Sequence, residues 1–300
     1  MRNLSWKKIV LKLIKMDSSY LLNNYLEKKL FELHSLQIDE YKNKSEIIIQ
    51  NIIGINKAQL YTETYSISKV EFQRLENAFS LLTQNTPVQH IIQESYFYND
   101  KFFTPPGVFI PRPESELIID CVKNDFSLSE KKTVLDIGSG SGCLSISLGN
   151  LYKDFSITGI DISNKAIEVS RKNARLLNTS NVKFINKDFF NINLNLFDII
   201  ISNPPYLSIY EIDNLDDSVS KHDPIIALSD QFDGLSFYRY FIDNLDYMLK
   251  KDGTMYLEIP NSNITEKIIN IINKRTNIAN EIFKDFEGNN RVIKIYFNTK

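Results

Sequence analysis

The chain has 300 residues, enough for one large domain or two smaller ones around a well-buried core. Its formal net charge of −2 argues against a nucleic-acid backbone as the main partner, because proteins that bind one usually carry a strong positive excess. Cys121 and Cys143 are too few for a disulfide framework, which favours a reducing compartment. The three histidines lack the spacing of metal ligands, so we expect no metal site.

The first sixteen residues are basic and contain Arg2, several lysines and no acid, with apolar residues interleaved. This pattern predicts an amphipathic helix. An organelle transit peptide is an alternative, but such peptides are usually rich in both Arg and Ser. No apolar run reaches the roughly 18 residues of a membrane span. We therefore expect a cytoplasmic protein, or one of an organelle matrix if this stretch is a transit peptide.

Residues 1–88 have the apolar spacing of helices. Apolar positions recur at helical intervals over residues 20–33, 47–53 and 70–82. Gly54 is a plausible helix stop, and Ser66 or Ser68 could cap the following helix. We predict a small helical bundle.

Residues 89–116 differ in composition from the helical stretch before them. Aromatic residues flank Asn99-Asp100, which predicts a hairpin with its turn at these two residues. Prolines 105, 106, 111 and 113 then make a stiff, non-helical connector.

In residues 117–300, short apolar runs alternate with helical patterns. Such alternation predicts a mostly parallel sheet covered on both faces by helices, an α/β fold of the Rossmann-like kind. The tail reads as a closing antiparallel hairpin, which brings the sheet to seven strands. The expected strands are residues 134–137, 157–161, 182–186, 197–202, 254–259, 278–286 and 291–297, with a helix ending at Lys251 before the fifth.

The first of these strands runs directly into a turn of small residues, Gly138, Ser139, Gly140, Ser141 and Gly142. Glycines let a ligand approach the main chain closely. The spacing is neither that of dinucleotide folds nor that of a phosphate loop. A tight strand-to-helix turn with no ligand is therefore an alternative interpretation of this loop taken alone.

The next two strands favour a ligand. Asp161 ends the second strand, about twenty residues past the glycines, where an acid can accept both hydroxyls of a ribose. Asp188 and Phe189 follow the third strand and could bond an adenine amino group and pack on its face. A glycine loop, a ribose acid and an adenine-side pair after successive strands together predict an adenosine site.

The fourth strand ends in Asn203, Pro204, Pro205 and Tyr206. A simple turn is one interpretation, since Asn-Pro is a common turn dipeptide. The alternative is chemical. An amide nitrogen is a poor nucleophile because its lone pair is delocalised. The Asn203 side-chain carbonyl and the Pro204 main-chain carbonyl could hold its two N–H bonds, with Tyr206 as a wall, so that the lone pair faces an electrophilic methyl group.

These features resemble the release-factor glutamine N5-methyltransferases, a family of class I S-adenosylmethionine-dependent enzymes. The resemblance covers nearly the whole chain. Beyond the tetrapeptide at 203–206, it is carried by residues 87–91, 110–116, 223–228, 233–235 and 285–292. Gln93, Ser115, Asp223 and Pro260 stand where that family usually has Gly, Thr, Glu and Gly.

The resemblance implies that S-adenosylmethionine binds residues 138–142, Asp161, Phe189 and Asn203. It implies that residues 203–206 hold the glutamine of the Gly-Gly-Gln motif of a peptide chain release factor. We expect residues 1–88 to help dock that partner, and the enzyme to be monomeric, without stable nucleic-acid or membrane binding. Two rivals remain open: an adenine N6-methyltransferase acting on DNA or RNA, and a non-catalytic adaptor on the same scaffold.

Overall fold

The computed structural model describes residues 21–191, 195–215, 217–260 and 263–298. The helix predicted for the first sixteen residues lies outside these ranges. The chain divides into two compact units, residues 1–93 and 94–300. No helix in the described ranges is long and apolar enough to cross a membrane.

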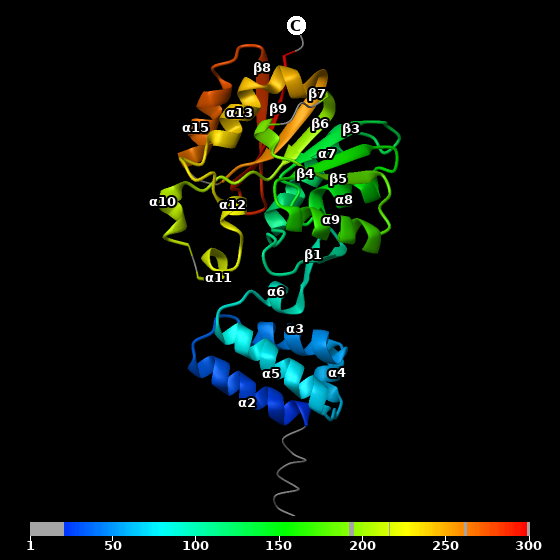
Figure 1. Cartoon of the computed structure of the whole chain (residues 1–300), viewed down its shortest axis with the longest axis vertical. Coiled ribbons are helices and arrows are strands. Elements are labelled where there is room, and N and C mark those ends of the chain that lie inside the picture. The colour runs from blue at the N-terminus through cyan, green and yellow to red at the C-terminus, as the bar shows by residue number, and fades with distance from the viewer. Residues whose placement is uncertain (1–20, 192–194, 216, 261–262, 299–300) are drawn as a thin grey trace, which may run out of the picture. The chain divides into compact units, whose positions relative to one another are not determined.

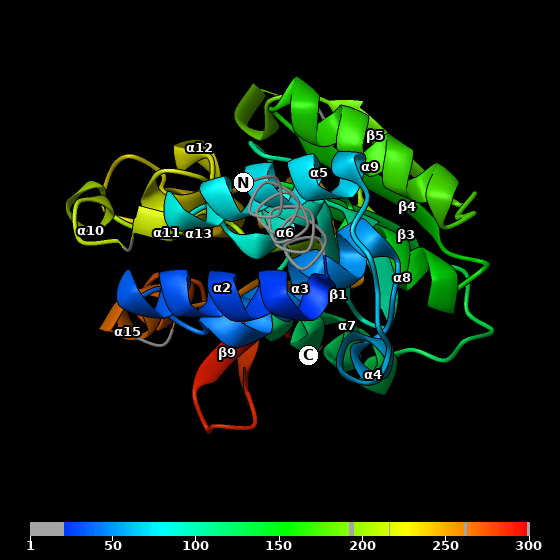
Figure 2. The ribbon, with the colours of Figure 1, turned by 90° about the horizontal axis from the view of Figure 1, so that it is seen from below.

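The first unit is helical, as its apolar spacing predicted. Gly54 ends the second of its described helices with φ +80°, a left-handed conformation that glycine adopts without strain. Ser68 caps the fourth of them by accepting a hydrogen bond from the main-chain nitrogen of Glu71. Helix α3 (Tyr41–Ile53) contacts both α2 (Leu22–Ser35) and α5 (Lys69–Thr83), and Figures 1 and 2 show these helices as one group. The helices are α2 (Leu22–Ser35), α3 (Tyr41–Ile53), α4 (Lys57–Thr62), α5 (Lys69–Thr83) and α6 (Val88–Ile92), of which α4 and α6 were not predicted.

The second unit opens with the hairpin of β1 (Glu94–Phe97) and β2 (Asp100–Phe103). Its turn lies one residue earlier than the sequence suggested, at Tyr98 and Asn99. Both have positive φ, +47° and +69°. A two-residue turn of this kind matches the twist of the strands, and it leaves Asp100 free to pair with Phe97.

A seven-stranded sheet forms the centre of this unit, and it confirms the predicted fold class. The strand order is β5-β4-β3-β6-β7-β9-β8. The strands from β5 to β7 are parallel, and β9 is antiparallel to both its neighbours. The strands are β3 (Thr133–Ile137), β4 (Ser156–Asp161), β5 (Val182–Asn186), β6 (Phe197–Ser202), β7 (Leu249–Glu258), β8 (Ile278–Lys284) and β9 (Asn290–Phe297).

The helix predicted to end at Lys251 is shorter than expected. It ends at Met248, as α14 (Leu245–Met248), and β7 begins at the next residue. The reason is tertiary: Leu249 pairs with Phe197 of β6, which requires extended backbone.

Helices cover both faces of the sheet (Figure 1). Ile199 and Ile201 of β6 pack on the side of α7, α8 and α9, whereas Ile200 packs on the side of α13 and α15. This alternation follows from the two-residue period of a strand. The helices are α7 (Glu116–Asp125), α8 (Cys143–Leu151), α9 (Asn164–Leu176), α13 (Ser236–Asp243) and α15 (Asn263–Ile272), and the short α10 (Ile209–Ile212), α11 (Asp217–Ser220) and α12 (Ile225–Leu228) lie between β6 and α13.

Candidate active site

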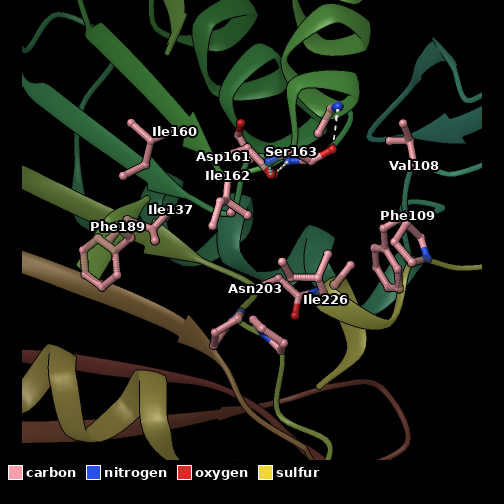
Figure 3. Close-up of a pocket in the computed structure, with 18 of the residues that line it drawn as sticks. Val108, Phe109, Ile137, Ile160, Asp161, Ile162, Ser163, Phe189, Asn203 and Ile226 are labelled. Carbon is pink, nitrogen blue, oxygen red and sulfur yellow. Dashed lines mark hydrogen bonds between the residues drawn. The ribbon is translucent and has the colours of Figure 1, made fainter. Parts of the chain in front are cut away.

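A cavity of about 300 Å³ lies at the carboxyl ends of β3, β4 and β6. This is the edge where parallel sheets bind ligands, because the loops there diverge from a common line of strand ends. Figure 3 shows Asp161, Phe189 and Asn203 around the cavity, each at or just after the end of a different strand. The structure thus brings together residues that the sequence placed after separate strands.

The glycine loop is held against β4 by its own main chain. The amides of Gly138 and Ser139 both donate to the carbonyl of Ile160, at 2.9 and 3.0 Å. Gly138, Gly140 and Gly142 all have positive φ. Residues 138–141 line the cavity, but Gly142 does not. A Cβ on Gly142 would lie 2.9 Å from the Phe184 ring, whereas one on Gly138 would meet nothing within 4 Å. Gly142 is therefore needed for packing, and Gly138 leaves main chain accessible to a ligand.

Asp161 has both carboxylate oxygens engaged by main-chain amides. Oδ2 accepts from Gly140 at 2.8 Å and Oδ1 accepts from Ser163 at 2.8 Å. Burial raises the pKa of this carboxyl above its ordinary value, although the two amide donors oppose the rise. A carboxylate has about four lone-pair sites, so further acceptor capacity remains for ligand hydroxyls. Asp161 thus fixes the loop and can bind a ligand at the same time.

Asp136 lies beneath the loop and is only 1% exposed. Ser145 donates to its Oδ2 at 2.6 Å, while Oδ1 has no partner among the described residues. Burial raises the pKa of Asp136 to about 7, and the nearby charge of Asp161 adds to the rise. The sequence interpretation did not single out this residue as part of the site.

Asp188 and Phe189 both line the cavity. The carboxylate of Asp188 accepts bonds from the Phe190 amide at 3.0 Å and from the Asn191 side chain at 2.6 Å. The Phe189 ring is 6% exposed and packs against Phe241 with ring centroids 5.2 Å apart. These contacts fix both residues in place, and Phe189 gives this end of the cavity an apolar surface.

Asn203, Pro204 and Pro205 line the cavity, but Tyr206 does not. Tyr206 packs against the hydrophobic core of α13 and β7, and its burial raises the pKa of its hydroxyl to about 12. A Cβ on Gly234 would lie 2.2 Å from the Tyr206 carbonyl oxygen, so only glycine fits there. The role of Tyr206 as a wall against the planar amide stays a prediction.

The sequence interpretation missed the partners of Asn203. Its Nδ2 donates to Ser115 Oγ at 3.0 Å, and Ser115 Oγ donates to Glu258 Oε2 at 2.5 Å. Ser115 is 3% and Glu258 2% exposed. A signal was present, because Glu258 is the one acid within the otherwise apolar run 255–259. A buried acid in such a strand needs a polar partner.

Arg112 ties the connector to the segment after β6. Its guanidinium donates to Asp223 Oδ2 at 2.7 Å, and the Asp223 side chain is 0% exposed. Arg112 also lies over the Phe109 ring, 5.2 Å from its centroid. Both Arg112 and Phe109 line the cavity. The ion pair therefore fixes Arg112, which forms part of the cavity wall.

The residues present fit S-adenosylmethionine as the cofactor. Open space beside Gly138 leaves the main chain accessible, Asp161 keeps lone pairs for ribose hydroxyls, and Phe189 offers an apolar surface for a base. The cavity volume of about 300 Å³ lies at the lower end of the range for small-molecule sites.

Two sequence profiles match the chain. The methyltransferase domain family matches residues 128–293, and the PrmC N-terminal domain family matches residues 15–92. A release factor glutamine methyltransferase from Thermodesulfovibrio yellowstonii is 34% identical over 253 residues, which are 83% of this chain and 90% of that protein. One from Bacillus subtilis is 30% identical over 260 residues, 84% of this chain and 90% of that protein. The chain therefore belongs to the family of release factor glutamine methyltransferases.

Proposed function

We propose that this enzyme transfers a methyl group from S-adenosylmethionine to the side-chain amide nitrogen, N5, of the glutamine in the Gly-Gly-Gln motif of peptide chain release factors. The observation that carries the proposal is the position of Asn203, which shares one cavity with the glycine loop and Asp161. The cofactor supplies an electrophilic methyl group on a positively charged sulfur.

The chain's own part in the reaction is to hold a neutral amide. The Nδ2 of Asn203 is bonded to Ser115, and within the described residues its Oδ1 accepts no hydrogen bond. Oδ1 and the Pro204 carbonyl are assigned as acceptors for the two N–H bonds of the glutamine amide. As the nitrogen gains positive character in the transition state, these acceptors interact with it more strongly, which raises turnover. Pro205 lines the cavity beside them, and the partly buried Tyr206 is assigned as the wall against the planar amide.

The partner is a protein. Adenine N6-methylation uses a similar planar nitrogen, but the net charge of −2 disfavours a nucleic-acid substrate. We expect a monomer that acts in the cytoplasm and binds neither nucleic acid nor membrane stably. Transfer of radiolabel from S-adenosylmethionine tests the assignment. Label should enter wild-type release factor and be absent from release factor in which that glutamine is replaced by Ala. Label in DNA or RNA in place of release factor would reject the proposal.

Residues 1–93 are assigned a docking role, because a single glutamine side chain offers too little surface for discrimination. A chain beginning at Glu94 should bind cofactor normally but methylate release factor poorly. Equal activity of the short and full chains would exclude this role. Loss of cofactor binding and activity together would mean that the helical unit only stabilises the fold.

A further inference from the structure

Three side chains from distant parts of the sequence form one hydrogen-bonded line behind the cavity. Asn203 follows β6, Ser115 precedes α7, and Glu258 ends β7. Asn203 and Ser115 line the cavity, whereas Glu258 does not. We infer that Glu258, acting through Ser115, is a positioning residue that determines which end of the Asn203 amide faces the substrate. This inference rests on the proposed function, in which that end must be the carbonyl.

The direction of the line follows from counting hydrogens. A serine hydroxyl has one hydrogen, and an ionised carboxylate can only accept. With Glu258 ionised, the Ser115 hydrogen points to Glu258, so the Ser115 oxygen can only accept from Asn203. The amino group of Asn203 must then face Ser115, as the 3.0 Å contact from Nδ2 records. Its carbonyl is left for the cavity.

Protonation of Glu258 removes this constraint. A neutral carboxyl can donate to the Ser115 oxygen. The Ser115 hydrogen then becomes available to the Asn203 carbonyl, and the amide can turn so that its amino group faces the cavity. An amino group cannot accept the N–H bonds of a glutamine. The charge on Glu258 therefore selects the orientation that the reaction needs.

The surroundings place this change near neutral pH. Burial raises the pKa of Glu258 to about 7; the Ser115 donor opposes the rise, the negative Glu114 adds to it, and Arg291 and Arg112 oppose it. On the side of α13, the Tyr238 hydroxyl donates to the main-chain carbonyl of Glu258 at 2.7 Å. The hydroxyl of Tyr206 is also close enough to be influenced by the Glu258 charge.

Steady-state kinetics of the full-length enzyme on release factor, from pH 6 to pH 8.5, give the first test. Ser115→Ala and Glu258→Gln should each lower kcat about tenfold at pH 8, as expected for loss of one charge-assisted hydrogen bond. Cofactor affinity and the KM for release factor should change less than about twofold, because the altered group acts on the transition state. Ser115→Thr keeps the hydroxyl and should retain most activity.

The pH profile needs a control, because Asp136 also has a pKa raised to about 7. In wild type, kcat should fall as the pH drops through 7. In Glu258→Gln this fall should shrink, because residue 258 no longer titrates; any fall that remains belongs to other groups such as Asp136. Ser170→Ala is the matched variant: Ser170 is 0% exposed and donates to the Ile167 carbonyl at 3.0 Å, away from the line. It should keep the wild-type kcat and profile.

Nuclear magnetic resonance reads the orientation without any turnover. The ¹⁵N–¹H signal of the Asn203 side-chain amide, assigned by its loss in Asn203→Ala, should shift between pH 6 and pH 8 in wild type and stay fixed in Glu258→Gln. The inference would be overturned if the wild-type signal did not change with pH, or if folded Glu258→Gln had a normal kcat. Neither outcome depends on whether Ser115→Ala folds. If the signal titrates as expected but wild type does not methylate release factor, the proposed function fails and the positioning line stands.

Discussion

The two sides of the cavity are held together in different ways. On the cofactor side, the glycine loop is fixed by main-chain bonds to β4 and by Asp161, only 21 residues from Gly140 in the chain. On the side proposed for the substrate, Asn203 bonds to Ser115, 88 residues away, and through it depends on Glu258. Main-chain bonds follow from local geometry and survive most substitutions, whereas a line of side chains fails if one member is lost. Substitutions on the substrate side should therefore mainly lower kcat. Substitutions on the cofactor side should mainly weaken cofactor binding.

The largest effect is expected on the substrate side. Asn203→Ala should lower kcat by roughly 10²–10³, the magnitude seen on removal of one preorganised polar group. Cofactor affinity, measured by calorimetry, should change much less. Asn203→Asp keeps an acceptor and should retain part of the activity. Near-normal turnover of the alanine variant on release factor would mean that Asn203 is only a turn residue. The substrate side would then not be the more sensitive one in catalysis.

On the cofactor side, Asp161→Ala should weaken S-adenosylmethionine binding about ten- to hundredfold, because charge-assisted hydrogen bonds are lost. Asp161→Asn sharpens the test. It keeps an acceptor for the Gly140 amide and should therefore lose less cofactor affinity than Asp161→Ala. Circular dichroism should show an intact fold. Unchanged calorimetric affinity in a folded Asp161→Ala would remove Asp161 from the binding site and leave it a loop-fixing role alone.

Within the glycine loop, packing and ligand access can be separated. Gly142→Ala should lower the free energy of unfolding by roughly 2–4 kcal/mol, because a left-handed backbone and a clash with Phe184 act together. Gly138→Ala meets no such clash and should cost about 1–2 kcal/mol. Denaturant titration measures both. Equal losses would show that backbone conformation alone, not the packing of Phe184, requires glycine at 142.

The last effect depends on pH and concerns Asp136. Its folded-state pKa of about 7 lies above the ordinary value of 3.8, so the folded chain keeps a proton that the unfolded chain releases between those values. Stability is therefore lost as the pH rises from about 4 to about 7. Asp136→Asn removes this titration, and its stability relative to wild type should be greater at pH 8 than at pH 4.5 by about 3 kcal/mol. A difference that does not vary with pH would contradict the raised pKa.

Much of the fold followed from the sequence, and so did the gathering of the predicted site residues at one cavity. The sequence signals for both are local. Strands β5 and β6 match their predicted bounds, since periodicity and turn residues act over a few positions. The rule that parallel strands end at one edge was enough to place Gly140, Asp161 and Asn203 at one cavity. The residue types, combined with that rule, predict the kind of site.

Tertiary structure decided what no local pattern contains. The pairing of Leu249 with Phe197 set where β7 begins, and Tyr206 packs against the core of α13 and β7. Gln93, where the resemblance led us to expect Gly, has φ +57°, which explains why glycine suits that position. The meeting of Ser115 with Glu258 joins residues 143 positions apart. Hydrogen bonds between buried side chains depend on how the sheet and helices bring distant residues together. The spacing of residues along the chain does not predict which of them will meet.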